Sequence, residues 1–192
     1  MSDSTLVKAA QVAATLAAAA ASGGIISISV FTIPAIAQPS RQSKGRDREK
    51  PGSAVSHVAQ QWEATYDLGK VVFPSIALAS SLLYSYVAYA VRDGTHGRRL
   101  SVLYLTAAGL VVMIAPITGA LIVPVNNKLH PYTLREDSFV KGEANAEERA
   151  RHEHEDHEFS GLLRKWSQLN LFRGLFPLFG ATLGATAAFG LV

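Results

Sequence analysis

Near the C-terminus, three side chains that could take part in chemistry share one face of an expected helix. Trp166, Asn170 and Arg173 follow one another at i, i+4 and i+7, and Pro177 continues the stripe at i+11. An arginine and an amide placed together can stabilise negative charge that develops on a substrate oxygen. Arg173 alone could instead extend its guanidinium to lipid headgroups. That alternative does not explain the position of Asn170 and Trp166, so we expect the stripe to face protein or water.

A second stripe carries aromatic rings. Trp62, Tyr66, Gly69 and Phe73 lie at i, i+4, i+7 and i+11, which predicts a helix that begins near Val55 and continues into an apolar stretch. These rings could form an aromatic belt at the membrane interface, or they could line a pocket. Both interpretations stay open.

A third stretch contains prolines one turn apart. Pro116 and Pro124 each free the carbonyl four residues earlier, on Val112 and Ala120, and a carbonyl freed in lipid needs another donor. The prolines could simply bend the helix. Alternatively, the bend opens a cavity whose mouth is lined by Asn126, Asn127 and His130.

Four stretches without a charged residue must position these side chains, namely 9–40, 71–91, 100–127 and 174–192. Each is long enough to cross a bilayer core of about 30 Å, which takes roughly 20 helical residues. The sequence therefore predicts one all-α domain over residues 1–192, a four-helix transmembrane bundle with polar loops. The expected spans are 10–37, 68–91, 100–125 and 169–191, and the expected polar loops are 39–66 and 126–167.

The composition excludes several classes of site. The 192-residue chain has no cysteine, which rules out disulfides, thiolate metal sites and a cysteine nucleophile. A net charge of +3 in a membrane protein indicates contact with anionic headgroups rather than with nucleic acid. The run "RHEHEDHE" at 151–158 resembles a metal-binding tract, but we expect a solvated loop there, because a rigid metal site needs oriented ligands. No dinucleotide or Walker motif occurs, so we expect neither a metal nor another cofactor.

The first apolar stretch contains an Ala35-Ile36-Ala37 sequence like that of a signal-peptidase site. The apolar part from Val12 onward is longer than the roughly 7–15 residues of a signal peptide, so we expect a retained helix. We expect a multi-pass protein of the endoplasmic reticulum or a related endomembrane, with its orientation open. Gly180 and Gly184 would let another helix approach closely, within the bundle or in a homo-oligomer.

Three motifs, "QWEATYDLG", "PITGALIVPVNNKL" and "WSQLNLFR", resemble in their order and spacing the anthrone oxygenase family, small four-helix membrane proteins of fungal polyketide pathways. The resemblance covers most of the chain and is carried by Trp62, Tyr66, Gly69, Pro116, Thr118, Pro124, Asn126 or Asn127, Leu129, Trp166, Asn170 and Arg173. It implies oxidation of an anthrone, a tricyclic phenolic ketone, to an anthraquinone by O₂ without flavin, haem or metal. The long acidic, His-rich segment departs from the family pattern.

Such a reaction needs a base, donors to the enolate oxygen and a dry slot for a flat ring system and O₂. The candidate bases are His57 and His130, with Asp67 as the second choice. The candidate donors are Arg173, Asn170, Asn126 and Gln61. The rings that would flank the substrate are Trp62, Tyr66 and Trp166.

Two other functions fit the same residues. In a non-catalytic bundle that binds an apolar ligand or supports a membrane complex, the stripe of Trp166, Asn170 and Arg173 would only tie helices together. In a metal-dependent oxygenase, His57 and His130 would be ligands. The surroundings of Arg173 separate the first alternative from catalysis. Bonds to carbonyls or to Asp67 inside a filled bundle favour a structural role, whereas an open aromatic cavity that reaches Arg173 favours catalysis.

Overall fold

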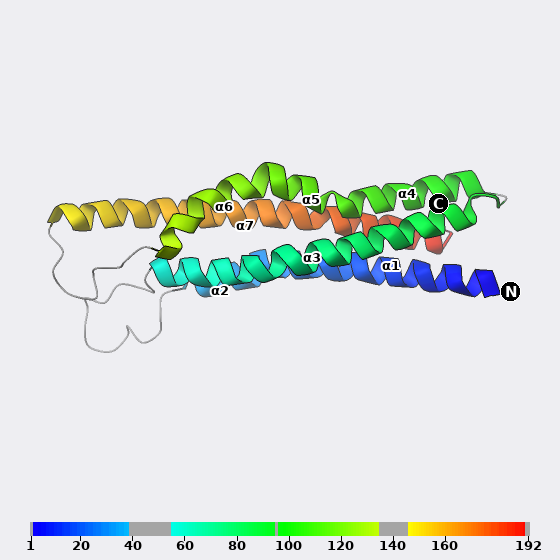
Figure 1. Cartoon of the computed structure of the whole chain (residues 1–192), viewed down its shortest axis with the longest axis horizontal. Coiled ribbons are helices and arrows are strands. Elements are labelled where there is room, and N and C mark those ends of the chain that lie inside the picture. Colours follow the sequence, from blue (N-terminus) through cyan, green and yellow to red (C-terminus); the bar gives the residue numbers. More distant parts are fainter. Residues whose placement is uncertain (1, 39–54, 95, 135–145, 191–192) are drawn as a thin grey trace.

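The protein is built from long helices. The computed structural model describes residues 2–38, 55–94, 96–134 and 146–190, and within them it has no β-strand. Four helical rods run along one long axis, and the first and last described residues lie at the same end (Figure 1). The predicted all-α, four-helix architecture is confirmed.

The first two rods each cover a single predicted span. The first consists of α1 (Ser2–Ser27), the π-helical turn η1 (Ile28–Thr32) and α2 (Ile33–Ile36). The second is α3 (Val55–Val91), which begins at the residue expected for it and continues through Pro74. The expected boundaries placed residues 55–66 in a polar loop, but these residues are helical.

The third rod is interrupted by its prolines. Its elements in chain order are α4 (Gly97–Val112), α5 (Ile114–Ile117), the π-helical η3 (Thr118–Ile122), α6 (Val123–Leu129) and the 3₁₀ turn η4 (His130–Leu134). The break between α4 and α5 lies at Met113, three residues before Pro116. Because proline has no N–H, Pro116 cannot bond to the Val112 carbonyl as a regular helix requires. Helical structure thus extends beyond residue 125, through the first part of the expected loop 126–167.

The fourth rod is one helix, α7 (Ala146–Ala188), and it is longer than expected. The prediction of a polar loop up to residue 167 was wrong for 146–167, including the His-rich run at 151–158. Residues 146–160 contain no glycine or proline and are rich in Ala, Glu and Arg, which favour helix. A polar composition was mistaken for a loop, although a polar helix of good helix formers can extend from the end of an apolar one.

The rods pack as a closed ring. Helix α1 contacts α3 and α7, and α4 contacts the same two helices from the other side. The core has two parts. The part nearer the termini is rich in alanine and contains Tyr84 and Tyr104, whereas the part near α2 and α6 contains Trp62 and Trp166. The larger aromatic side chains therefore gather at the end where the third rod is irregular.

Four segments are long and apolar enough to cross a membrane, as predicted for a multi-pass membrane protein. Among the residues that the structure describes, they are Ser4–Ile36, Val55–Val91, Gly97–Leu134 and His154–Ala188. Large apolar side chains on their outer faces, such as Leu16, Leu82 and Phe179, are more than half exposed. Such an exposed apolar surface is suited to lipid.

Small residues of α7 allow close packing inside the bundle. Gly180 lies against α4, where an added Cβ would come within 2.7 Å of Val111 Cγ2 and 3.0 Å of the Ala107 carbonyl oxygen. Gly184 lies against Tyr84 of α3. The glycine pair thus serves packing between the helices of one chain.

We predict that Gly180→Leu lowers the thermal unfolding temperature in detergent, because overpacking a helix contact costs about 1–3 kcal/mol. Gly109→Leu is the matched control, since an added Cβ at Gly109 meets no atom within 4 Å. Circular dichroism at increasing temperature measures both. Equal melting temperatures for the two variants would contradict the tight contact between α4 and α7.

Candidate functional site

The stripe on α7 lies inside the bundle. The exposed fractions of Trp166, Asn170 and Arg173 are 1%, 0% and 3%. The expectation that this face avoids lipid is met, so headgroup contact does not account for Arg173. The partners of the guanidinium then decide what the stripe does.

Arg173 is held by neutral oxygen atoms. Its Nη2 donates to Asn170 Oδ1 at 2.6 Å, and its Nη1 donates to Thr118 Oγ1 at 2.9 Å. Glu63, Asp67 and Asp93 form ion pairs among the described residues, and none of these three pairs includes Arg173. Both terminal nitrogens of the buried guanidinium are therefore bonded to neutral oxygen atoms.

Asn170 connects this arginine to the first rod. Its Nδ2 donates both to the Ile25 carbonyl and to Ser29 Oγ, each at 2.9 Å. Both amide hydrogens are used, and the amide oxygen accepts from Arg173, so the orientation of the amide is determined by its partners. Asn170 thus holds Arg173 in place and joins α7 to α1 and η1.

The two π-helical turns supply the hydroxyl partners. Ser29 belongs to η1 and Thr118 to η3, and each turn precedes a proline, Pro34 or Pro124. In η1 the Ile33 N–H bonds to the Ile28 carbonyl five residues earlier. Continuing this pattern, Pro34 has no N–H for the Ser29 carbonyl, which accepts from the Ser167 hydroxyl at 3.1 Å instead. Single π-helical turns occur frequently at functional sites.

Aromatic rings from three rods surround Trp62. Trp62 is stacked with Tyr66 (centroids 5.9 Å apart, planes at 6°) and meets Trp166 edge to face at 6.0 Å and 89°. Trp166 donates from Nε1 to Asn126 Oδ1 at 2.7 Å. Arg173 lies two turns beyond Trp166 on the same buried face of α7. The structure therefore brings together Trp62, Tyr66, Asn126, Trp166, Asn170 and Arg173, a group that we call the buried cluster.

Three nitrogen atoms of the buried cluster have no hydrogen-bond partner among the described residues: Trp62 Nε1, Asn126 Nδ2 and Arg173 Nε. All three are donors. Because Asn126 Oδ1 accepts from an indole that can only donate, its amide nitrogen is the atom left over. Buried polar groups are normally paired, and each of these three donors can bond an oxygen acceptor or a water molecule.

His130 adjoins the buried cluster and has an acidic partner. Its ring meets Trp62 at 5.6 Å and 69°, and its Nδ1 lies 2.8 Å from Oε1 of Glu63. The His130 and Glu63 side chains are 42% and 33% exposed, at the edge of the cluster. Sequence reasoning missed Glu63, whose only signal was its position beside Trp62 in "QWE".

His57 and Gln61 lie apart from this arrangement. Gln61 Nε2 and His57 Nε2 are 3.0 Å apart across one turn of α3, and both side chains are exposed. Asp67, the second choice for a base, is exposed and pairs with Lys70 at 2.6 Å. Of the candidate bases, His130 is the one in contact with the buried cluster.

The sequence profile described as anthrone oxygenase matches residues 62–183. The chain belongs to the anthrone oxygenase family. The match contains the buried cluster, Glu63 and His130, and it begins after His57 and Gln61. Family membership makes the protein an oxidoreductase of the monooxygenase type.

Curated fungal relatives cover most of the chain. An anthrone oxygenase of Claviceps purpurea is 28% identical over 86% of this chain and 80% of its own length. Monooxygenase hypC of Dothistroma septosporum is 31% identical over 85% of this chain and 74% of its own. Anthrone oxygenase tpcL of Aspergillus fumigatus is 29% identical over 85% and 83%. No solved structure matches the chain significantly.

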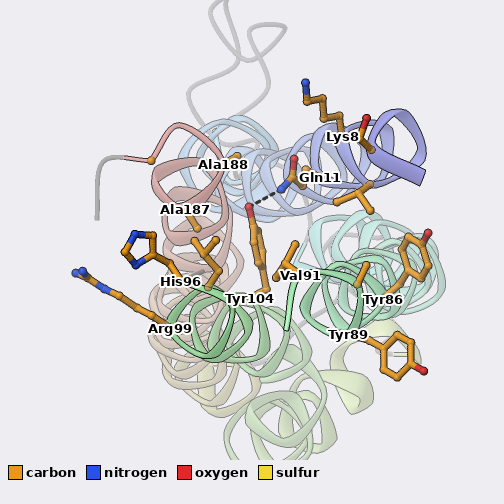
Figure 2. A pocket seen from close by; sticks show the side chains of 15 residues that line it. Lys8, Gln11, Tyr86, Tyr89, Val91, His96, Arg99, Tyr104, Ala187 and Ala188 are labelled. Carbon is orange, nitrogen blue, oxygen red and sulfur yellow. Dashed lines mark hydrogen bonds between the residues drawn. The ribbon is translucent and has the colours of Figure 1, made fainter. Parts of the chain in front are cut away.

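In this member of the anthrone oxygenase family, a cavity of about 1020 Å³ opens at the other end of the bundle. Figure 2 shows it with the hydrogen bond from Gln11 Nε2 to the Tyr104 hydroxyl, 2.9 Å long, at its inner wall. Lys8 and Arg99 at its rim point in different directions and do not converge on one point (Figure 2). None of the predicted site residues lines this cavity.

Within the parts of the chain that are described, no group of three or more His, Asp or Glu side chains is arranged to hold a metal ion. The run at 151–158 lies on α7, but the side chains of 151–153 are outside the described part of the chain. The expectation of a metal-free site stays a prediction.

The two buried tryptophans allow a matched test of the hydrogen-bond assignment. We predict that Trp166→Phe destabilises the protein more than Trp62→Phe, because it leaves Asn126 Oδ1 buried without its donor, at a cost of about 1–3 kcal/mol. Trp62→Phe removes the same group without breaking a hydrogen bond. Thermal unfolding in detergent measures the difference, and an equal loss in both variants would refute the assignment.

Proposed function

We propose that this protein oxidises an anthrone-type aromatic polyketide to the anthraquinone with O₂, inside a membrane and without a bound cofactor. Family membership and the names of the relatives support the substrate class. The observation that carries the proposal is the buried cluster, with a guanidinium bonded to neutral oxygen atoms and three donors that have no acceptor among the described residues.

The reaction balances without an added reductant. A base removes one proton from the methylene carbon of the anthrone. The electron pair of that C–H bond stays on the molecule, which becomes an enolate with negative charge on the former carbonyl oxygen. The enolate transfers electrons to O₂, and a C–O bond forms to give a peroxide at the former methylene. Loss of the second proton and cleavage of the O–O bond give the carbonyl and water. The four electrons lost by the CH₂ group reduce both atoms of O₂.

The enolate oxygen is the acceptor that the buried cluster lacks. Arg173 supplies positive charge, and the N–H groups of Arg173, Asn126 and Trp62 supply donors in a site with little water. Fixed donors in such a site stabilise developing charge more than water does, because they need no reorganisation. Asn170, whose amide hydrogens are both used, positions Arg173 rather than contacting the substrate.

His130 is the proposed base, and Trp62 and Tyr66 the proposed stacking surface for the rings. His130 and Tyr66 are partly exposed, whereas Trp62 is 0% exposed. We therefore place the substrate entrance at His130 and Tyr66, where displacement of two side chains uncovers Trp62. His57 and Gln61 have no part in this proposal, since both lie exposed on the outer surface of α3.

The membrane has a direct role in this proposal. Anthrones and O₂ are both more soluble in an apolar phase than in water, so lipid around the four spans supplies both reactants and keeps water from the enolate. An endomembrane, such as the endoplasmic reticulum, is the proposed location.

Arg173→Met separates catalysis from a structural role for the stripe. The substitution leaves Asn170 Oδ1 without a donor, at a cost of about 1–3 kcal/mol, while Thr118 keeps its bond to the Ile114 carbonyl, so we predict a folded variant of lower stability. We also predict that its turnover of emodin anthrone falls about 10²- to 10³-fold, as on loss of an oxyanion donor. Quinone absorbance and O₂ uptake, corrected for autoxidation, measure the rate.

Arg164→Met on the exposed face of the same helix is the control, and it should keep wild-type turnover. A folded Arg173→Met protein with full turnover would refute the role in catalysis and support the stripe as a helix tie.

We further predict that purified protein treated with EDTA and dialysed retains its turnover, because the phenolic substrate supplies the electrons. Elemental analysis of the same sample shows whether metal has been removed. Loss of activity that Fe²⁺ or Cu²⁺ restores, but Mg²⁺ does not, would favour the metal-dependent alternative with His57 and His130.

A further inference from the structure

The 3₁₀ turn η4 packs against α3 through contacts with residues on one part of that helix. Gln60 Nε2 donates to the Thr133 carbonyl at 3.1 Å, and Trp62 meets the ring of His130. The Thr133 hydroxyl donates to the His130 carbonyl at 2.8 Å, which closes the turn. These contacts hold the backbone of His130 and one edge of its ring, and none of them involves Glu63.

We propose that Glu63 is the positioning residue for His130, an inference that rests on the proposed function. Glu63 Oε1 accepts from Nδ1 at 2.8 Å, which places the hydrogen of the neutral imidazole on Nδ1. The lone pair then remains on Nε2. A carboxylate behind a catalytic imidazole both selects this tautomer and stabilises the imidazolium that forms when the ring takes a proton.

The proton balance of the reaction uses this arrangement twice. His130 Nε2 takes the methylene proton, while the electrons of the broken C–H bond stay on the anthrone as the enolate. After O₂ has bonded to that carbon, the Nε2 proton passes to the outer peroxide oxygen. His130 Nε2 then takes the second proton of the same carbon as the C=O bond forms and the O–O bond breaks, and it gives this proton to the departing hydroxide, which leaves as water. His130 ends the cycle neutral, and Glu63 keeps its negative charge throughout.

The alternative is an incidental ion pair at the edge of the bundle. Partly exposed pairs contribute little to stability, so stability cannot distinguish the two roles. A positioning role affects the tautomer of His130 and the rate of proton removal, whereas an incidental pair affects neither. Both quantities can be measured.

The experiment compares Glu63→Gln and Glu63→Asp with wild type, using emodin anthrone with either hydrogen or deuterium on its methylene carbon. We expect Glu63→Gln to lower kcat about 10- to 100-fold. This is less than the ~10²- to 10⁴-fold decrease in rate expected when the base itself is lost. KM should change little, the isotope effect on kcat should rise, and Glu63→Asp should recover part of the loss. Glu158→Gln, an exposed carboxylate on α7, is the control expected to behave as wild type.

A second measurement does not require turnover. In detergent-solubilised protein labelled with ¹⁵N-histidine, the signal lost in His130→Gln identifies His130, and its shifts report the tautomer. We expect the Nδ1–H form in wild type and a mixture in Glu63→Gln. A wild-type Nε2–H form would overturn the proposal whether or not the anthrone is a substrate.

The outcomes separate this inference from the proposed function. Wild-type kcat in Glu63→Gln, with His130→Gln inactive, would overturn the role of Glu63 and leave the base and the reaction in place. An active His130→Gln would overturn both the base and its positioning residue. A wild-type protein without turnover would count against the proposed function, and the tautomer would then decide the role of Glu63.

Discussion

The buried positive charge of Arg173 is the constraint on which this bundle depends. A guanidinium loses its water when it enters an apolar interior, and this is costly unless protein oxygens replace the water. Here the replacements are the oxygen of Asn170 and the hydroxyl of Thr118, from two different rods. Asn170 extends the connection to Ile25 and Ser29 of the first rod. One charge therefore determines how three of the four rods must meet.

The irregular helices supply partners for this charge and for the amide that holds it. Ser29 and Thr118 lie in π-helical turns that precede prolines, and each presents its hydroxyl to α7. Inside a membrane every backbone group freed by such a turn needs a partner, which Ser167 provides for the Ser29 carbonyl. Ser22 likewise donates to the Gly174 carbonyl at 2.8 Å. The polar face of α7 and the irregularity of its neighbours therefore require each other.

Periodicity and the absence of charge were enough to predict the four spans and the inward face of Trp166, Asn170 and Arg173, because both depend on local sequence. The contact of Glu63 with His130 could not be predicted, since it joins residues far apart in the chain through the docking of η4 on α3. His57 and His130 looked equivalent in the sequence, and only tertiary contacts distinguish them. The length of α7 was missed because polarity was taken to indicate a loop.

Structural support and the proposed chemistry use different atoms of the same side chains. The terminal nitrogens of Arg173 bond within the protein, while its Nε has no acceptor among the described residues. Asn126 likewise uses its oxygen for Trp166 and keeps its amide nitrogen unpaired within that part of the chain. Fully satisfied groups would have nothing to offer a substrate oxygen, and unsatisfied ones would not hold the charge in place. The burial that makes the charge costly also strengthens its interaction with an enolate, because little water screens it.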